Sequence, residues 1–235
     1  MEKIYTIPVN EAFDRSAADK ACGCPFCALY NMLEQNELDA VLGASMMEPD
    51  VRIETNKKGF CKTHFDLMLG YKNKLGLALM LESHLGQNKS ALFPTGISGL
   101  FGGGAEKRLS ELNQSCYVCD RIEYHFSRMI DTAVLLHGQE AAFRKKFEAQ
   151  PYFCLPHYAR LLAYAKQKMN KKAFAALEAA ARRIEETYFT ELSGDVSWFC
   201  KKFDYRYADE PWNNAKDAVE RAGKFLRSDL HAPKK

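Results

Sequence analysis

A duplicated pattern of cysteine and histidine constrains the fold of this 235-residue chain more than any other feature. In the first copy, "CPFC" places Cys24 and Cys27 two residues apart. After 33 intervening residues, "GFCKTH" supplies Cys61 and His64 with the same spacing. A single Cys-x-x-Cys pair is a weak signal, but a second pair at a long interval points to a site that joins remote parts of the chain.

The second copy repeats this order of residues. "CYVC" gives Cys116 and Cys119, and 34 residues later "YFCLPH" gives Cys154 and His157. The first pair is displaced by 92 positions and the second by 93, so one inserted residue accounts for the difference. Flanking aromatic positions also correspond: Phe60 and Phe153, Phe65 and Tyr158, Tyr71 and Tyr164. An internal repeat of this kind should be identified before any fold is assigned, because it indicates where the chain divides into two similar parts.

Three cysteines and one histidine form a common ligand set for structural zinc, which is tetrahedral. Two residues between ligands let a tight turn or the first turn of a helix aim both side chains at one ion. We therefore predict two Cys3His zinc sites, one in each copy. In this prediction Cys24, Cys27, Cys61 and His64 form the first site. Cys116, Cys119, Cys154 and His157 form the second.

Other uses of the same residues stay open at this stage. Iron–sulfur clusters prefer sets made only of cysteine, although histidine replaces cysteine in some. A thiol switch could release zinc on oxidation, with Cys22 as a neighbouring thiol, while Cys200 reads as a small core residue. A catalytic Cys–His pair could be drawn from either Cys-x-x-His motif. The duplication argues against an enzyme, because an enzyme rarely needs two identical nucleophile sets, whereas a scaffold often repeats a structural link.

Composition excludes several classes of function. The net charge is +3 and the sequence pI is about 8.3, with Lys and Arg interleaved with Asp and Glu. A dedicated nucleic-acid binder would carry a stronger basic bias, so a weak nucleic-acid-binding zinc module is retained only as an alternative. Because the N-terminus lacks a signal-like apolar core and no run reaches about 20 apolar residues, we expect no membrane segment and a cytoplasmic location. In that reducing compartment cysteines favour metal binding over disulfides.

Apolar residues recur at helical spacing through most of the chain. The pattern predicts helices over 62–86, 118–137 and 171–192, and a helix in the tail with Pro211 near its start. No convincing alternation typical of strands is present. The fold class is therefore all-α, built from two tandem metal-linked helical repeats and a C-terminal helix.

The repeat also predicts the domain organisation. Residues 1–95 would form the first repeat and 109–200 the second, joined by a glycine-rich linker or lid over 96–108. Residues 201–235 would form an aromatic segment and a helix that pack back on the core. The aromatic residues near 198–212 could alternatively line an apolar groove with Lys202 and Arg206 at its rim.

Taken together, these motifs resemble those of a family of uncharacterised bacterial proteins, mostly from anaerobes. The resemblance rests on "CPFC", "GFC" followed by His64, "CYVCDRI", and a tail with Asp204–Arg206 ("DYR"), Pro211–Trp212 ("PW") and "KDAVERA". It covers most of the chain and implies no established activity. Some members are labelled as transporter-associated, but this sequence does not support that label, because a secreted binding protein would need an export signal. The sequence thus predicts a structural or interaction module whose protein or small-molecule partner and oligomeric state it does not identify.

Overall fold

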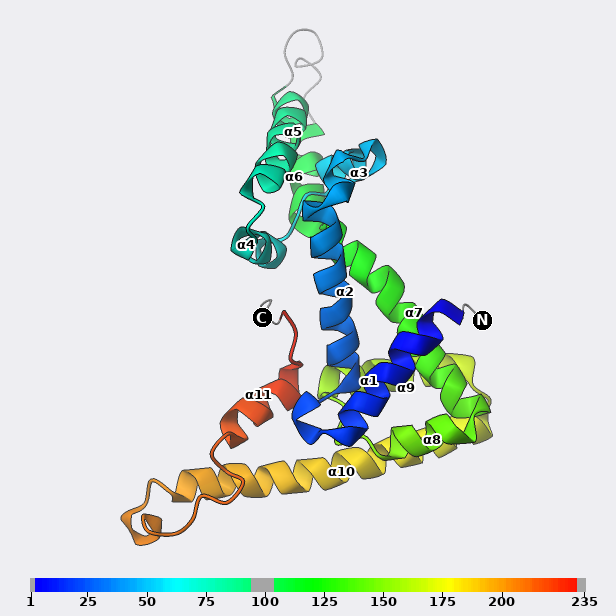
Figure 1. Ribbon diagram of the computed structural model, residues 1–235, viewed down its shortest axis with the longest axis vertical. Coiled ribbons are helices and arrows are strands. Elements are labelled where there is room, and N and C mark those ends of the chain that lie inside the picture. Colours follow the sequence, from blue (N-terminus) through cyan, green and yellow to red (C-terminus); the bar gives the residue numbers. More distant parts are fainter. Residues whose placement is uncertain (1–2, 94–103, 232–235) are drawn as a thin grey trace. The chain divides into compact units, whose positions relative to one another are not determined.

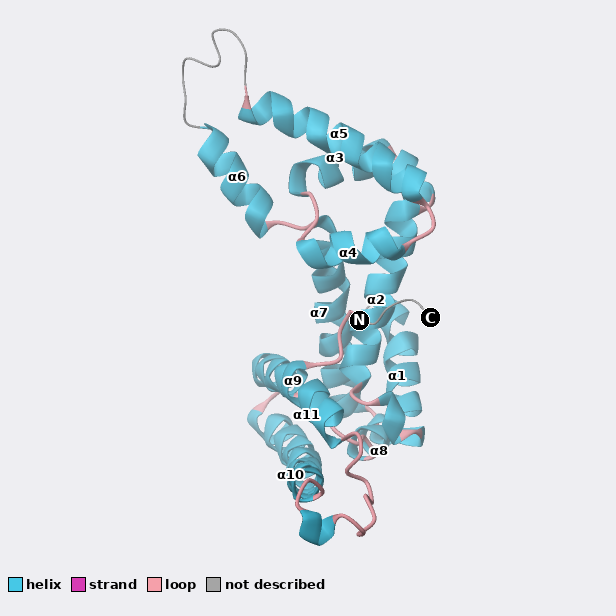
Figure 2. Ribbon diagram, turned by 90° about the vertical axis from the view of Figure 1, so that its left-hand side faces the viewer, coloured by secondary structure: helices cyan, strands magenta, loops and turns pink. Residues whose placement is uncertain are grey.

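The computed structural model describes residues 3–93 and 104–231, and within these ranges the regular structure consists only of helices (Figures 1 and 2). This confirms the all-α prediction. The α-helices are α1 (Thr6–Ala18), α2 (Pro25–Leu42), α3 (Pro49–Lys58), α4 (Lys62–Gly70), α5 (Lys74–Leu92), α6 (Gly104–Gln114), α7 (Tyr117–Gln139), α8 (Ala141–Glu148), α9 (Leu155–Lys168), α10 (Lys171–Lys201) and α11 (Ala218–Arg227). Most of the predicted linker, residues 96–103, lies outside the described residues.

The predicted helix over 62–86 is wrong as a single element. The structure has α4 and α5 there, separated at residues 71–73. Asn73 explains the restart, because its side-chain oxygen accepts a hydrogen bond from the Gly76 N–H and caps α5. The helix predicted over 118–137 is confirmed by α7, which extends it by one residue at its start and two at its end.

Two predicted boundaries near the C-terminus also differ. Helix α10 continues for 31 residues to Lys201, beyond the expected end at 192. Helix α11 starts at Ala218, so Pro211 does not open it. The Pro211 carbonyl instead accepts a hydrogen bond from the Trp198 indole N–H at 3.0 Å, which holds the intervening turns against the end of α10.

The described chain divides into two compact units. The first contains residues 3–31 and 126–230, and the second contains 32–93, 104–125 and His231. The chain passes from one unit to the other within α2, within α7 and after Leu230. The tandem boundaries at 95, 108 and 200 describe the sequence duplication and stay a prediction.

The core of the first unit is aromatic. Phe13 of α1 is fully buried, with its ring centroid 4.9 Å from that of Phe143 and 6.2 Å from that of Phe153. Phe26 and Phe153 also contact each other, at 5.7 Å. Ring pairs at these separations contribute packing energy beyond their buried area. Since Phe26 lies between Cys24 and Cys27, this core supports part of the predicted ligand set directly.

In the second unit, α5 packs against α3 and α6. Met68, Leu77 and Met80 supply buried side chains, each 3% exposed or less. The end of α3 is joined to the start of α7, because Ser115 Oγ donates to the Lys58 carbonyl at 2.7 Å and the Tyr117 N–H donates to the Gly59 carbonyl at 3.0 Å. These bonds fix the segments that precede two of the ligand motifs.

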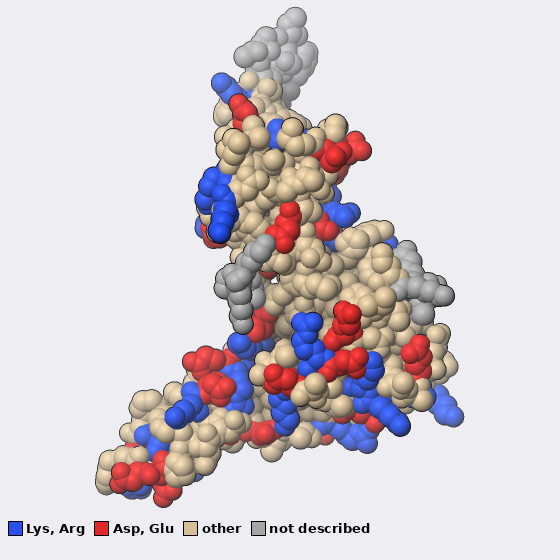
Figure 3. Space-filling model, viewed as in Figure 1, with Lys and Arg blue, Asp and Glu red and all other residues tan. Residues whose placement is uncertain are grey.

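The surface carries both signs of charge. On the face shown in Figure 3, Lys and Arg side chains are interspersed with Asp and Glu. None of the helices in the described part of the chain has the length and apolar character needed to cross a membrane.

Candidate metal centres

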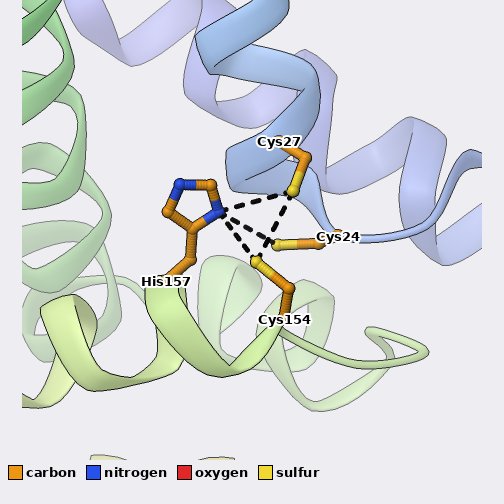
Figure 4. A group of neighbouring side chains, drawn as sticks. All are labelled: Cys24, Cys27, Cys154 and His157. Atoms are coloured by element: carbon orange, nitrogen blue, oxygen red, sulfur yellow. Dashed lines mark hydrogen bonds between the residues drawn. The ribbon is translucent and has the colours of Figure 1, made fainter. Parts of the chain in front are cut away.

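The first candidate centre joins Cys24 and Cys27 at the start of α2 with Cys154 and His157 at the start of α9 (Figure 4). Cys27 Sγ lies 3.5 Å from Cys154 Sγ and 3.5 Å from His157 Nδ1. His157 Nδ1 lies 3.8 Å from Cys24 Sγ and 3.1 Å from Cys154 Sγ. All four residues are buried. We call this set the first centre.

The second candidate centre joins Cys61 and His64 at the start of α4 with Cys116 and Cys119 at the start of α7. His64 Nδ1 lies 3.2 Å from both Cys61 Sγ and Cys116 Sγ, and 3.4 Å from Cys119 Sγ. Cys61 Sγ and Cys119 Sγ are 3.8 Å apart. His64 and Cys116 are buried, whereas Cys61 and Cys119 are partly exposed. We call this set the second centre.

The structure thus brings together all eight predicted residues, but the predicted pairing of one site per repeat is wrong. Each centre takes its Cys-x-x-Cys pair from one copy and its Cys-x-x-His pair from the other. Helix geometry gives the reason: α2 continues from Cys27 to Leu42, so it carries the chain about 22 Å beyond Cys27 before the next motif is reached. The contact of Phe26 with Phe153, one residue before Cys154, then favours the exchanged partner.

All four motifs use the same local geometry. In each, the first ligand is the residue immediately before a helix, and the second is the third residue of that helix. The extended backbone of Cys61 and of Cys154 at these helix starts turns the side chain toward the first helical turn. The free N–H groups and positive dipole end of a helix N-terminus favour a thiolate there.

A glycine shapes the entry to the first centre. Gly23 precedes Cys24 and has φ +68°, a conformation that side chains with a Cβ rarely adopt. A Cβ at this position would lie 2.9 Å from Tyr152 Oη. Ser16 Oγ donates a hydrogen bond to the Gly23 carbonyl, which ties the turn to α1.

Within the first centre, three thiolates cannot coexist without a balancing cation. Hydrogen bonds from Cys24 and Cys27 lower the pKa of Cys154 far below its usual range. Burial raises the pKa of Cys24, and the hydrogen bond to Cys154 raises the pKa of Cys27 to about 12. One sulfur is therefore anionic and the other two stay protonated unless positive charge is supplied.

In the second centre one sulfur is likewise anionic, and the imidazole beside it is cationic. A hydrogen bond from Cys119 is the main cause that lowers the pKa of Cys116, to about 3, while the pKa of Cys119 rises far above its usual range. Burial lowers the pKa of His64, but hydrogen bonds to Cys116 and Glu34 outweigh it and raise this pKa to about 10. The surroundings of His64 Nδ1 therefore stabilise positive charge at the position where a metal ion would sit.

Several neighbours of the centres were not identified from the sequence. Ser228 Oγ lies 3.0 Å from Cys154 Sγ, and the Asp229 N–H donates to Cys27 Sγ at 3.4 Å. In the second unit, Glu34 Oε1 contacts both His64 and His231. A signal for Glu34 did exist: it follows Cys27 by seven residues, close to two helical turns, in a mostly apolar helix. No sequence pattern marks Ser228, Asp229 or His231.

The remaining candidates lie outside both centres. Cys22 and Cys200 are exposed free thiols, so the expectation of Cys200 as a core residue is wrong. It follows Phe199 on the part of α10 that extends past the predicted end. Lys202 Nζ donates to the carbonyls of Tyr207, Ala208 and Glu210 at 2.5–2.8 Å and closes the local turns, while the apolar groove near 198–212 stays a prediction.

Comparison with known proteins places the chain by family but assigns no activity. Residues 1–233 match a family described as a family of unknown function (DUF6062). No curated protein and no solved structure matches the chain.

Proposed function

The chain belongs to the DUF6062 family, whose function is unknown, and from its two centres we propose that it is a zinc protein in which each centre holds one structural ion. One observation carries the proposal. In each centre, three sulfurs and one imidazole nitrogen all lie within 4.8 Å of one another. That spacing suits donors that share a single ion.

The distances fit a tetrahedral zinc site. With Zn–S near 2.3 Å and Zn–N near 2.0–2.1 Å, the edges of a tetrahedron are about 3.8 Å between sulfurs and about 3.6 Å between sulfur and nitrogen. Eight of the twelve donor pairs in the two centres lie 3.1 to 3.8 Å apart, and all twelve lie within 4.8 Å. A disulfide would need about 2.05 Å between sulfurs, and all eight cysteines are free.

The donor sets also favour a structural role over a catalytic one. Four protein ligands fill a tetrahedral zinc site and leave no position for a substrate. Each ion would join segments more than a hundred residues apart in the first centre, such as Cys24 and His157, and more than fifty apart in the second, such as His64 and Cys116. Such links stabilise a helical scaffold. A role in binding a partner is supported by the aromatic side chains of Phe203 and Tyr205, which are 76% and 88% exposed.

A redox role at the second centre is the second candidate. Its two partly exposed sulfurs, Cys61 and Cys119, are the pair that lie 3.8 Å apart. Hydrogen peroxide, with two protons from solvent, would take two electrons from these thiolates, forming one disulfide and two waters and releasing the metal. Eight free thiols are consistent with a reducing compartment, which supports a cytoplasmic location within this proposal.

Elemental analysis of the full chain, purified without oxygen, tests the proposal. We expect two equivalents of zinc per chain and a colourless protein. A brown protein that contains iron and absorbs visible light would contradict it in favour of an iron–sulfur protein, and a metal-free folded protein would contradict both. Peroxide that leaves both zinc ions bound would remove the redox candidate.

A further inference from the structure

A buried carboxylate stands directly behind the histidine of the second centre. Glu34 is only 3% exposed, and its Oε1 lies 3.2 Å from His64 Nε2. The opposite nitrogen of the same ring, Nδ1, faces the three sulfurs at 3.2–3.4 Å. The imidazole therefore lies between the sulfur cluster and the carboxylate, with one nitrogen directed to each.

The same oxygen of Glu34 has a second partner. His231 Nδ1 lies 2.6 Å from Glu34 Oε1, and the His64 and His231 rings are nearly perpendicular, with centroids 6.1 Å apart. Two imidazoles on one oxygen restrict the rotation of a side chain that is already buried. The carboxylate is consequently fixed in the position that meets His64 Nε2.

The first centre differs at the equivalent position. The displacement of 92 residues that relates Cys27 to Cys119 also relates Glu34 to Phe126. Phe126 is fully buried and packs edge-on against His157, with ring centroids 5.2 Å apart. The hydrogen-bond contacts found for His157 among the described residues all use Nδ1 and run to the three sulfurs. One copy thus places a carboxylate, and the other an apolar ring, against the histidine of a centre.

We propose that Glu34 is a positioning residue specific to the second centre, where it accepts the Nε2–H of His64 and keeps the Nδ1 lone pair directed at the metal. This inference rests on the proposed function, because it assumes that the centres bind zinc. A carboxylate in this place fixes the tautomer and the ring orientation and makes the imidazole a stronger ligand. The two centres are therefore chemically distinct, and the second alone depends on a charged partner for its histidine.

Substitutions at Glu34 in the full chain test this role, with zinc as the probe. Glu34→Phe gives the second centre the residue that the first centre has. We expect it to weaken zinc binding by about 10–100-fold at one centre and to leave the other unchanged. Glu34→Gln keeps an oxygen acceptor without the charge, and we expect a smaller loss. Glu37→Gln is the matched control, because Glu37 lies one turn further along α2 and pairs with Arg121 at 3.3 Å instead of with His64.

Chelator competition measures the two affinities, and two further readouts separate positioning from general stability. Cobalt(II) substituted at the second centre should show an altered absorption spectrum in Glu34→Phe. Because zinc on Nδ1 leaves the proton on Nε2, NMR of the zinc-loaded proteins should detect the His64 Nε2–H in each of them. In Glu34→Phe, where the acceptor is gone, this proton should resonate upfield of its wild-type position and exchange faster with solvent, whereas Glu34→Gln should stay close to the wild type.

Wild-type affinity at both centres in Glu34→Phe, with unchanged spectra, would overturn the inference while leaving the zinc proposal intact. If Glu34→Phe does not fold, Glu34→Gln decides: affinity equal to that of the wild type overturns the role of the charge, and a loss confined to one centre supports it. A wild-type chain that binds no zinc would instead contradict the proposed function itself.

Discussion

Cys24 Sγ and His157 Nδ1 lie 3.8 Å apart although 133 residues separate them in the chain. This contact joins the first Cys-x-x-Cys pair to the last Cys-x-x-His pair. It shows that the two sequence copies exchange ligands, so each centre depends on both halves of the chain. A fragment that contains only one copy would carry half of each centre.

Paired serine substitutions test this exchange. Cys24→Ser should lose one zinc equivalent, because a neutral hydroxyl replaces a thiolate ligand. Adding Cys154→Ser should cost no second equivalent, since both residues belong to the first centre. Adding Cys61→Ser to Cys24→Ser should lose both equivalents. Elemental analysis of the three proteins gives the stoichiometry, and one equivalent retained by the Cys24→Ser, Cys61→Ser protein would restore the pairing of one site per repeat.

The buried carboxyl of Glu185, near the first centre, should make the free energy of unfolding depend on pH. It is 6% exposed, its Oε1 accepts the Phe153 N–H at 2.7 Å, and its Oε2 has no partner. Burial raises its pKa from 4.5 to about 8. Because the folded protein keeps this proton to a higher pH than the unfolded chain, the stabilisation is full below pH 4.5 and is lost as the pH rises through about 8.

The Glu185→Gln variant isolates this effect, because the amide oxygen can accept the same N–H but cannot ionise. Compared with the wild type, its free energy of unfolding should change little at pH 5 and rise by on the order of a few kcal/mol at pH 9. Urea unfolding of both zinc-loaded proteins at several pH values measures the difference. Parallel pH profiles would show that Glu185 ionises alike in the folded and unfolded chain.

Any side chain at position 23, directly before Cys24, should lower the free energy of unfolding. Gly23→Ala forces a residue with a Cβ into φ +68° and brings that Cβ to 2.9 Å from Tyr152 Oη. We expect a loss of about 1–3 kcal/mol in the free energy of unfolding and weaker zinc retention at the first centre.

Gly194→Ala serves as the control for Gly23→Ala. Gly194 lies in α10, and a Cβ there would meet no atom within 4 Å. Alanine should stabilise the helix by about 0.5–1 kcal/mol. Urea unfolding compares the two variants, and equal effects of both would show that the turn before Cys24 tolerates a side chain.

Features that depend on neighbouring residues could be predicted well. Cys-x-x-Cys and Cys-x-x-His need only one helical turn to bring their two side chains together, so the four ligand pairs follow from local spacing. The helical pattern of α7 is also local, and its predicted range agrees closely with Tyr117–Gln139. By contrast, the break between α4 and α5 depends on the single capping residue Asn73, which a long apolar pattern conceals.

The sequence by itself determined that the chain is helical and that eight residues form four short ligand pairs, because both properties arise within a few residues of backbone. Only the tertiary structure decided which pairs meet and that Glu34 and His231 stand behind His64. The physical reason is that pairing ligand motifs within one copy and pairing them between the two copies satisfy the same local spacing. The choice between them comes from remote contacts, such as Phe26 with Phe153 and Ser115 with Lys58, which no period in the sequence encodes.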